Sequence, residues 1–196
     1  RQMCIRDRSK YTSKNFNMKC THPFNELKGA DKIAKYLWST IKKSFKPIQR
    51  RMDIFYAGTN LVDNHSSKWV VNMGHLLGSF NNPFLGIEPT KKTVMLWYCE
   101  FYRVENNKIT EGAFFLDILK FMQHLKLSVV PDSTGMIGFN PGPKTHDGLY
   151  FEKQSDEEGN KTLNLMMRMA NRLIGEGMRT TVSDLEKDWH EDMIWW

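Results

Sequence analysis

The stretch Tyr102–His124 holds the residues whose types and spacing are best suited to chemistry. It reads YRVENNKITEGAFFLDILKFMQH, so two strand-like runs flank a polar turn and the second run ends in a carboxylate. Side chains of a strand alternate between its two faces. One face is therefore expected to carry Ile109, Glu111, Ala113, Phe115 and Asp117. An acid at the end of such a face is either a buried catalytic group or a helix cap.

The sequence leaves both interpretations of Asp117 open. A helical pattern starts at Ile118, and Asp is a preferred residue at a helix N-cap. The helix N-terminus would then hold the carboxylate ionised and weaken it as a base. In the catalytic interpretation Asp117 lies in a pocket lined by apolar groups such as Phe115. Burial would then favour the protonated form and suit the group to general acid/base work.

Three other residues, His75, Glu100 and Arg103, are candidates for lining the pocket. Glu100 and Arg103 are separated by an odd number of residues, so they are expected on opposite faces of one strand. A charge in a strand covered on both sides needs a partner. His75 is either a hydrogen-bonding group of the pocket or a strand histidine that faces the helix layer.

Metal chemistry has little support. His146 and Asp147 are adjacent in a loop rich in Pro and Gly, but a third ligand is missing nearby. This pattern favours a loop turn over a metal site. We therefore expect no metal.

A helix is expected first among the elements that position these residues. Ile33, Leu37, Ile41 and Phe45 recur every four residues after Gly29, and Pro47 is expected to end the helix. Its other face is rich in lysine. We interpret this as a solvated face and not as a nucleic-acid surface, because no aromatic residues interleave with the lysines.

Strands are expected to follow the helix. They are a short strand at 52–58, a long strand at 69–80 bent at Gly74 and Gly78, and a doubly covered strand at 93–104. A last strand at 108–116 is expected to return antiparallel to 93–104 through a hairpin turn at Asn106-Asn107. A helix followed by antiparallel strands is an α+β layout with the helix on one face of a curved sheet. Residues 9–28 are polar and irregular in pattern.

Composition narrows the class of protein. The net charge is +6 over 196 residues, and no apolar run approaches the roughly 20 residues that span a bilayer. Cys20 and Cys99 are far apart and fit a reducing compartment. We expect a cytoplasmic protein with no membrane or nucleic-acid partner.

The chain is expected to divide into unequal parts. Residues 1–8, RQMCIRDR, resemble a translated sequencing adapter of the kind found at the ends of metagenomic reading frames, so they do not enter the fold prediction. Residues 150–162 are expected as a linker, and a new helical pattern starts at Leu163. The aromatic end Met193–Trp196 looks like the start of a strand without neighbours, so this second unit is predicted to be truncated.

Four pieces in this order resemble the SnoaL-like polyketide cyclase (ester cyclase) family. They are GHLLGSF (74–80), LGIEPT (85–90), EFYRVENNKITE (100–111) and the acid Asp117. The resemblance covers about residues 22–149 as one module. PGPKTHDGL (141–149) and DWHEDMIWW (188–196) look like a subgroup with two modules in tandem, the second at 163–196.

The resemblance implies a nuclear-transport-factor-2-like cone, in which a curved antiparallel sheet wraps round an N-terminal helix and leaves an apolar pocket. It implies cofactor-free chemistry on a small apolar carbonyl substrate. Asp117 would remove a proton next to a carbonyl, and the enolate would close a ring by attacking a second carbonyl. The pocket would be lined by His75, Trp97, Glu100, Arg103, Ala113 and Phe115. A homodimer, or a pairing of the tandem modules, is the expected assembly.

Two departures from the family pattern keep other functions open. Leu76 stands where family members often carry His, and His124-Leu125-Lys126 stands where Gln-Leu-Gly is usual. In addition, Ala113 stands where Trp is usual, which would enlarge the pocket. The first alternative is therefore a non-catalytic ligand-binding or assembly module on the same fold. The second is a hydrolase or dehydratase that uses the same Asp117.

Overall fold

The computed structural model describes residues 10–127, 131 and 147–191. The chain divides into two compact units after Phe151, and each is described here by itself. None of the described helices is both long enough and apolar enough to cross a membrane.

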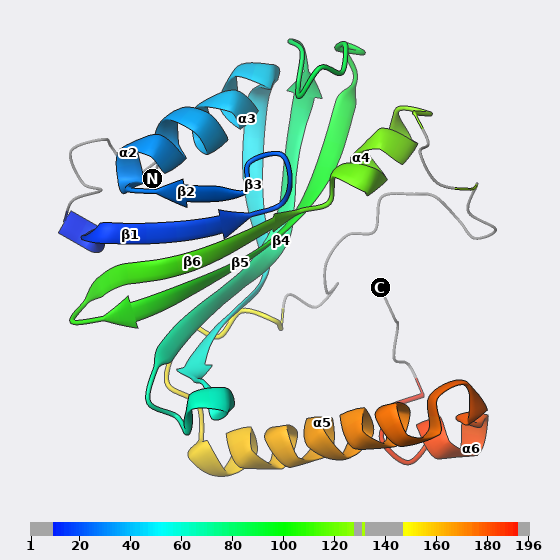
Figure 1. Cartoon of the computed structure of the whole chain (residues 1–196). Coiled ribbons are helices and arrows are strands. Elements are labelled where there is room, and N and C mark those ends of the chain that lie inside the picture. The colour runs from blue at the N-terminus through cyan, green and yellow to red at the C-terminus, as the bar shows by residue number, and fades with distance from the viewer. Residues whose placement is uncertain (1–9, 128–130, 132–146, 192–196) are drawn as a thin grey trace. The chain divides into compact units, whose positions relative to one another are not determined.

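The first unit is built on an open six-stranded sheet in the order β2-β1-β6-β5-β4-β3 (Figure 1). Its strands are β1 (Thr12–Cys20), β2 (Glu26–Lys28), β3 (Phe45–Thr59), β4 (Lys68–Phe80), β5 (Thr93–Glu105) and β6 (Lys108–Leu116). A short 3-10 turn, η2 (Leu61–Asp63), joins β3 to β4, and α4 (Ile118–His124) follows β6. The long strands β3 to β6 pair antiparallel in sequence order.

The predicted hairpin of 93–104 and 108–116 is confirmed. Asn106 and Asn107 have φ angles of 49° and 59°, as a two-residue hairpin turn with the twist of the strands requires. A bulge lies where Arg103 pairs with Glu111 but the next residue, Val104, pairs with Ile109. The extra residue reverses the alternation, so Ile109 packs against the core. Its expected place on one face with Phe115, which is 56% exposed, is therefore wrong.

A helical layer covers one face of the sheet, which we call the inner face (Figure 1). It consists of α2 (Ala30–Lys32), a π-helical segment η1 (Ile33–Trp38) and α3 (Ser39–Ser44). Ile33, Leu37 and Ile41 are buried in the core, as their spacing predicts. Phe45, expected as the last apolar residue of the helix, is instead the first residue of β3, so the helix ends before Pro47 is reached.

The first strands of the sheet were not predicted. Residues within 9–28 form β1 and β2, and β1 pairs parallel with β6, so the sheet is mixed and not wholly antiparallel. The apolar signal of β1 is weak because only Phe16 and Met18 reach the core among polar neighbours. The short strand expected at 52–58 is part of the longer β3.

Gly74 and Gly78 permit close backbone approach where a bend of β4 was expected. The register shifts lie in the partner strand β3, between Phe45 and Ile48 and again at Asp53. A Cβ atom on Gly74 would lie 2.0 Å from the carbonyl oxygen of Arg51. The glycines therefore accommodate the bulges of β3.

The second unit begins with a helix inside the stretch expected as a linker. Its elements are α5 (Asp156–Glu176), η3 (Gly177–Arg179) and α6 (Val182–Leu185). Ser155 caps α5 by accepting from the Glu158 N–H at 3.4 Å, and three acids in the first turn favour the same end. The strand expected at Met193–Trp196 lies outside the described residues. The tandem second module and its truncation stay predictions.

Candidate functional site

The centre of β5 places a row of polar side chains on the inner face of the sheet. Tyr98, Glu100 and Tyr102 alternate with residues of the opposite face, and Glu100 pairs across the sheet with Asn72 of β4. Arg50 approaches from β3. We call Arg50, Asn72, Tyr98, Glu100 and Tyr102 the inner cluster. It is a polar group within an otherwise apolar face.

An ion pair between Arg50 and Glu100 is the centre of the inner cluster. Nη2 of Arg50 contacts Oε2 of Glu100, and Nδ2 of Asn72 donates to the same oxygen at 3.3 Å. The Glu100 side chain has 0% exposure, whereas that of Arg50 has 39%. Arg50 is therefore the part of the pair that a ligand can reach.

Two aromatic rings and a hydroxyl hold the guanidinium of Arg50 in place. Its centre lies 4.8 Å from the Tyr98 ring and 5.8 Å from the Trp38 ring. Its Nε donates to the Tyr98 hydroxyl at 3.1 Å, and that hydroxyl donates to the Arg51 carbonyl at 3.1 Å. No hydrogen bond joins the Nη1 amino group of Arg50 to another of the described residues.

Gly74 makes this arrangement possible. It lies directly across from Tyr98, and a Cβ atom at Gly74 would be 3.0 Å from the Tyr98 hydroxyl. Tyr98 can therefore pass over β4 and reach β3 without meeting a side chain. Gly112 does the same for Tyr102, because a Cβ atom there would lie 3.2 Å from the Tyr102 ring.

Burial shifts the titration of the acidic members of the inner cluster. It raises the pKa of the Glu100 carboxyl, and the positive charge of Arg50 opposes this shift without cancelling it. Burial raises the pKa of Tyr102 well above its ordinary value, and the charge of Glu100 adds to the effect. Glu100 is thus a carboxyl that can hold a proton more readily than an exposed one.

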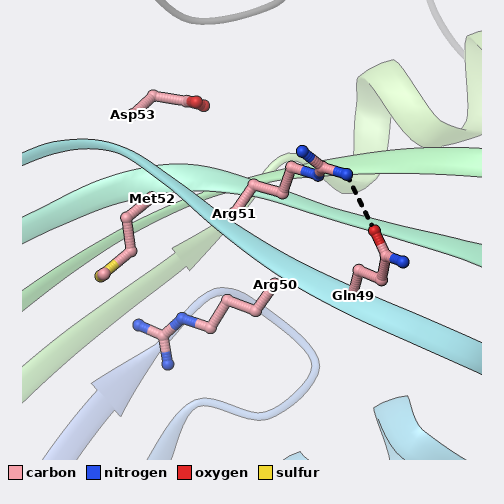
Figure 2. A pocket seen from close by; sticks show the side chains of 5 residues that line it. All are labelled: Gln49, Arg50, Arg51, Met52 and Asp53. Atoms are coloured by element: carbon pink, nitrogen blue, oxygen red, sulfur yellow. Dashed lines mark hydrogen bonds between the residues drawn. The ribbon is translucent and has the colours of Figure 1, made fainter. Parts of the chain in front are cut away.

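An open hollow of about 520 Å³ lies along β3, the edge strand of the sheet. It is lined by Gln49, Arg50, Arg51, Met52 and Asp53, and we call it the β3 hollow. In Figure 2 the Arg50 side chain extends to one side of the strand, while Arg51 and Asp53 lie on the other. Of the inner cluster, Arg50 is the member that lines the hollow.

The end of the inner face next to α4 is filled with aromatic side chains. Phe45, Phe80, Phe84 and Phe121 are fully buried there, and their ring centroids are 5.0–5.8 Å apart. An apolar pocket was expected between helix and sheet. At this end the space is occupied by packed rings.

Asp117 makes the contact of a helix cap. Its Oδ1 accepts from the Lys120 N–H at 2.8 Å at the start of α4, and the side chain is exposed. Its own N–H donates to the Trp97 carbonyl at 2.9 Å, which ties the end of β6 to β5. The catalytic role of Asp117 stays a prediction.

His75 lies on the outer face of the sheet, so the interpretation in which it faces the helical layer is wrong. Its Nδ1 is 2.8 Å from Oδ2 of Asp53, and both residues are buried. The Trp97 ring packs edge-on against it, with centroids 5.3 Å apart. The bulge at Asp53 turns this carboxylate to the outer face, where it engages His75.

The other candidates also lie on the outer face. Arg103 pairs with Glu105 at 2.7 Å and with Glu111 at 3.9 Å, so its expected place opposite Glu100 is confirmed. Ala113 lines a second hollow, of about 400 Å³, together with aromatic residues such as Tyr56 and Trp69. Of the residues expected in the pocket, the structure brings only Glu100 into the inner cluster.

Sequence reasoning missed most of the inner cluster. The pattern Tyr98-x-Glu100-x-Tyr102 is a usable signal, because alternation places all three side chains on one face. Arg50 and Asn72 lie in strands whose register the sequence does not fix. Among the described residues, no group of three His, Cys, Asp or Glu side chains could hold a metal ion, and His146 lies outside those residues.

No protein-family model matches the chain, and no curated protein sequence matches it. Solved structures do. The chain is similar to IdmH from Streptomyces antibioticus, a proposed polyketide cyclase, with a TM-score of 0.50 and 11% identity over 62% of this chain and 86% of that one. A proposed SnoaL-like polyketide cyclase from Jannaschia sp. CCS1 gives 0.47 and 15% identity, over 63% and 77%. An NTF2-like protein from Burkholderia thailandensis gives 0.45 and 14%, over 60% and 80%.

The first unit is an α+β protein with a curved, open sheet and a helical layer on its inner face. This is the fold seen in IdmH, and the predicted α+β fold class is confirmed. At 11% identity the likeness establishes the fold alone.

Proposed function

We propose that the chain binds a small carbonyl compound at the inner cluster and catalyses cofactor-free acid/base chemistry on it, of the ring-closing type. The observation that supports this most directly is the pairing of a fully buried carboxylate with a partly exposed arginine at the edge of a hollow. A carboxylate that exchanges a proton and a cation that stabilises an oxyanion are the two groups that enolate chemistry needs.

In this proposal Arg50 binds the substrate carbonyl oxygen through its Nη1 amino group. Ligand binding draws the guanidinium toward the hollow and away from Oε2 of Glu100. The positive charge of Arg50 holds the pKa of Glu100 down, so its withdrawal makes the carboxylate a stronger base.

The reaction needs no cofactor, because the proton that Glu100 removes is returned to the product. Glu100 takes a proton from the carbon next to the bound carbonyl, and the electron pair moves onto the oxygen held by Arg50. The enolate carbon forms a bond to a second carbonyl of the same molecule, whose oxygen takes the proton back from Glu100. Positioning within the hollow supplies the intramolecular advantage. Asp117 is the alternative group for the proton transfer, as the resemblance implies.

A panel of linear 1,3-dicarbonyl esters tests the proposal, with cyclisation followed by chromatography. Glu100→Gln removes the proton-transferring group and keeps the shape, so turnover should fall by about 10²-fold to 10⁴-fold. Asp117→Asn is the matched control, and its turnover should equal that of the wild type. Full turnover in Glu100→Gln would refute the role of Glu100. A loss confined to Asp117→Asn would assign the chemistry to Asp117.

The second candidate function is a ligand-binding module without catalysis. It is favoured by the 0% exposure of Glu100 and by the capping contact of Asp117. Saturable binding of the same esters without any cyclised product would select this function.

A further inference from the structure

The outer face of the sheet carries a second hollow, which the proposed function does not use. Four residues form a row across this face: Tyr56 of β3 pairs with Val71 of β4, Val71 with Phe101 of β5, and Phe101 with Ala113 of β6. Paired residues of neighbouring strands project from the same face. All four line the hollow of about 400 Å³, which we call the outer hollow. The sheet itself therefore builds it, on the face opposite the inner cluster.

The outer hollow combines small residues with aromatic rings. Ala113 and Gly58 line it, and a Cβ atom on Gly58 would meet no heavy atom within 4 Å. Tyr56 and Trp69 line it too, and neither ring contacts another aromatic ring among the described residues. The four buried phenylalanines next to α4, by contrast, each contact at least two of the others. The outer hollow thus offers ring faces that the described chain leaves without an aromatic partner.

Charge and polarity define the ligand further. All residues that line the outer hollow are uncharged. Arg103 lies directly across from Trp69 on this face, but it is paired with Glu105 at 2.7 Å. Asn60 also lines the hollow, and its Oδ1 accepts from the Val62 N–H at 3.0 Å. No hydrogen bond joins the Asn60 Nδ2 to another described residue, so this amide is available as a donor to a ligand.

We infer that the outer hollow is a second ligand site, for a neutral compound that has a flat aromatic ring and a hydrogen-bond acceptor. The ring matches the free faces of Tyr56 and Trp69, since aromatic rings gain free energy from contact with one another. The acceptor matches the Asn60 amide, and the uncharged lining favours a neutral ligand. A volume of about 400 Å³ lies within the range of small-molecule sites.

A matched pair of ketones tests the inference. Acetophenone and cyclohexyl methyl ketone share one carbon skeleton and one carbonyl group, but only the first has a flat ring. Binding to the full chain is followed by NMR at the Trp69 indole N–H, whose signal is identified by its loss in Trp69→Phe. Acetophenone should shift this signal saturably. The cyclohexyl ketone should bind about two- to tenfold more weakly, because an aromatic pair contributes a factor of that size.

Three variants locate the site. Ala113→Leu puts a larger side chain into the hollow and should abolish the shift. Ala57→Leu is the matched control, since Ala57 is exposed and follows Tyr56 on the other face of β3, so the shift should persist. Asn60→Asp keeps the acceptor for the Val62 N–H and removes the donor, so acetophenone should bind about two- to tenfold more weakly. Circular dichroism verifies that each variant is folded.

The outcomes that would overturn the inference are distinct. No shift at millimolar ketone, equal affinity for the two ketones, or a shift that survives in Ala113→Leu would refute the site. Full affinity in Asn60→Asp would refute the contact with the acceptor. If the Trp69 signal moves with protein concentration alone, and sedimentation detects a dimer that Ala113→Leu dissociates, a second copy fills the hollow and the ligand site is refuted. None of these outcomes touches the role of Glu100, because the measurement does not depend on turnover.

Discussion

Two arginines with nearly equal exposure lie on opposite faces of the same sheet. The Arg50 side chain on the inner face is 39% exposed, and the Arg103 side chain on the outer face is 38% exposed. Arg50 pairs with Glu100, which has no exposure, whereas Arg103 pairs with Glu105 and Glu111, which are themselves partly exposed. The comparison shows that burial of the partner, and not of the arginine, separates a candidate site from a surface ion pair.

The largest expected effect comes from the glycine beneath the inner cluster. Gly74→Ala would place a Cβ atom 2.0 Å from the Arg51 carbonyl oxygen, and a backbone atom cannot move away as a side chain can. We expect a loss of about 3 kcal/mol in the free energy of unfolding, measured by urea denaturation. Gly58→Ala on β3 meets nothing within 4 Å and is the control. Equal stability of the two variants would contradict the close approach of the Arg51 carbonyl oxygen to Gly74.

The two arginines themselves give the next largest difference. Arg50→Met leaves the Glu100 carboxyl buried without its cation, and we expect a loss of about 2 kcal/mol in the free energy of unfolding. This lies below the usual cost of breaking a buried pair, because Arg50 is partly exposed and Glu100 can take up a proton.

Arg103→Met removes an exposed ion pair, so its cost should stay within about 0.5 kcal/mol. Urea denaturation of the two variants side by side measures the difference directly. A loss for Arg103→Met as large as that for Arg50→Met would contradict the distinction between the two faces.

A smaller effect is expected in the pH dependence of stability. The folded-state pKa of Glu100 is raised above its ordinary value, mainly by burial, so the folded state binds the proton more tightly than the unfolded state. The stability that comes from this proton is present at low pH and is lost as the pH rises through the folded-state pKa.

Thermal unfolding of the wild type and of Glu100→Gln from about pH 4 to about pH 8 measures this effect. The melting temperature of the wild type should fall relative to that of the variant as the pH rises. A difference that stays constant over the range would show that Glu100 titrates alike in both states.

The sequence correctly predicted the elements that depend on residues close together in the chain. The Asn106-Asn107 turn and the four-residue spacing of Ile33, Leu37 and Ile41 depend only on near neighbours, and both are confirmed. The strand β1 was missed because its pairing partner β6 lies far along the chain. Ile109 was misplaced because a bulge in a strand pair reverses the alternation and leaves no mark in composition.

The candidate site was harder to predict for the same reason. Glu100 could be named because a charge in a doubly covered strand needs a partner. That partner, Arg50, lies two strands away, and its face depends on the register between β3 and β4. A carboxylate at a strand end, by contrast, is visible in the sequence, and this is why Asp117 was a candidate from the sequence alone. The inner face carries a candidate site because side chains from several strands meet there, and the residue types alone do not reveal this.

The smallest effect on stability is expected for the variant Asp117→Asn. Its Oδ1 accepts from the Lys120 N–H at 2.8 Å, and asparagine caps a helix about as well as aspartate. Asp117→Asn should therefore leave the free energy of unfolding unchanged, while Asp117→Ala should lower it by about 1 kcal/mol. Both are measured by urea denaturation next to Glu100→Gln.

The turnover assay makes this a test of function as well. If Asp117 is only a cap, both of its variants should cyclise the dicarbonyl esters as the wild type does, because neither touches the inner cluster. If Asp117 is the general acid/base group, Asp117→Asn should lose about 10²-fold or more in turnover with unchanged stability. A loss of turnover without a loss of stability would therefore move the catalytic site from the inner cluster to the junction of β6 and α4, where Asp117 lies.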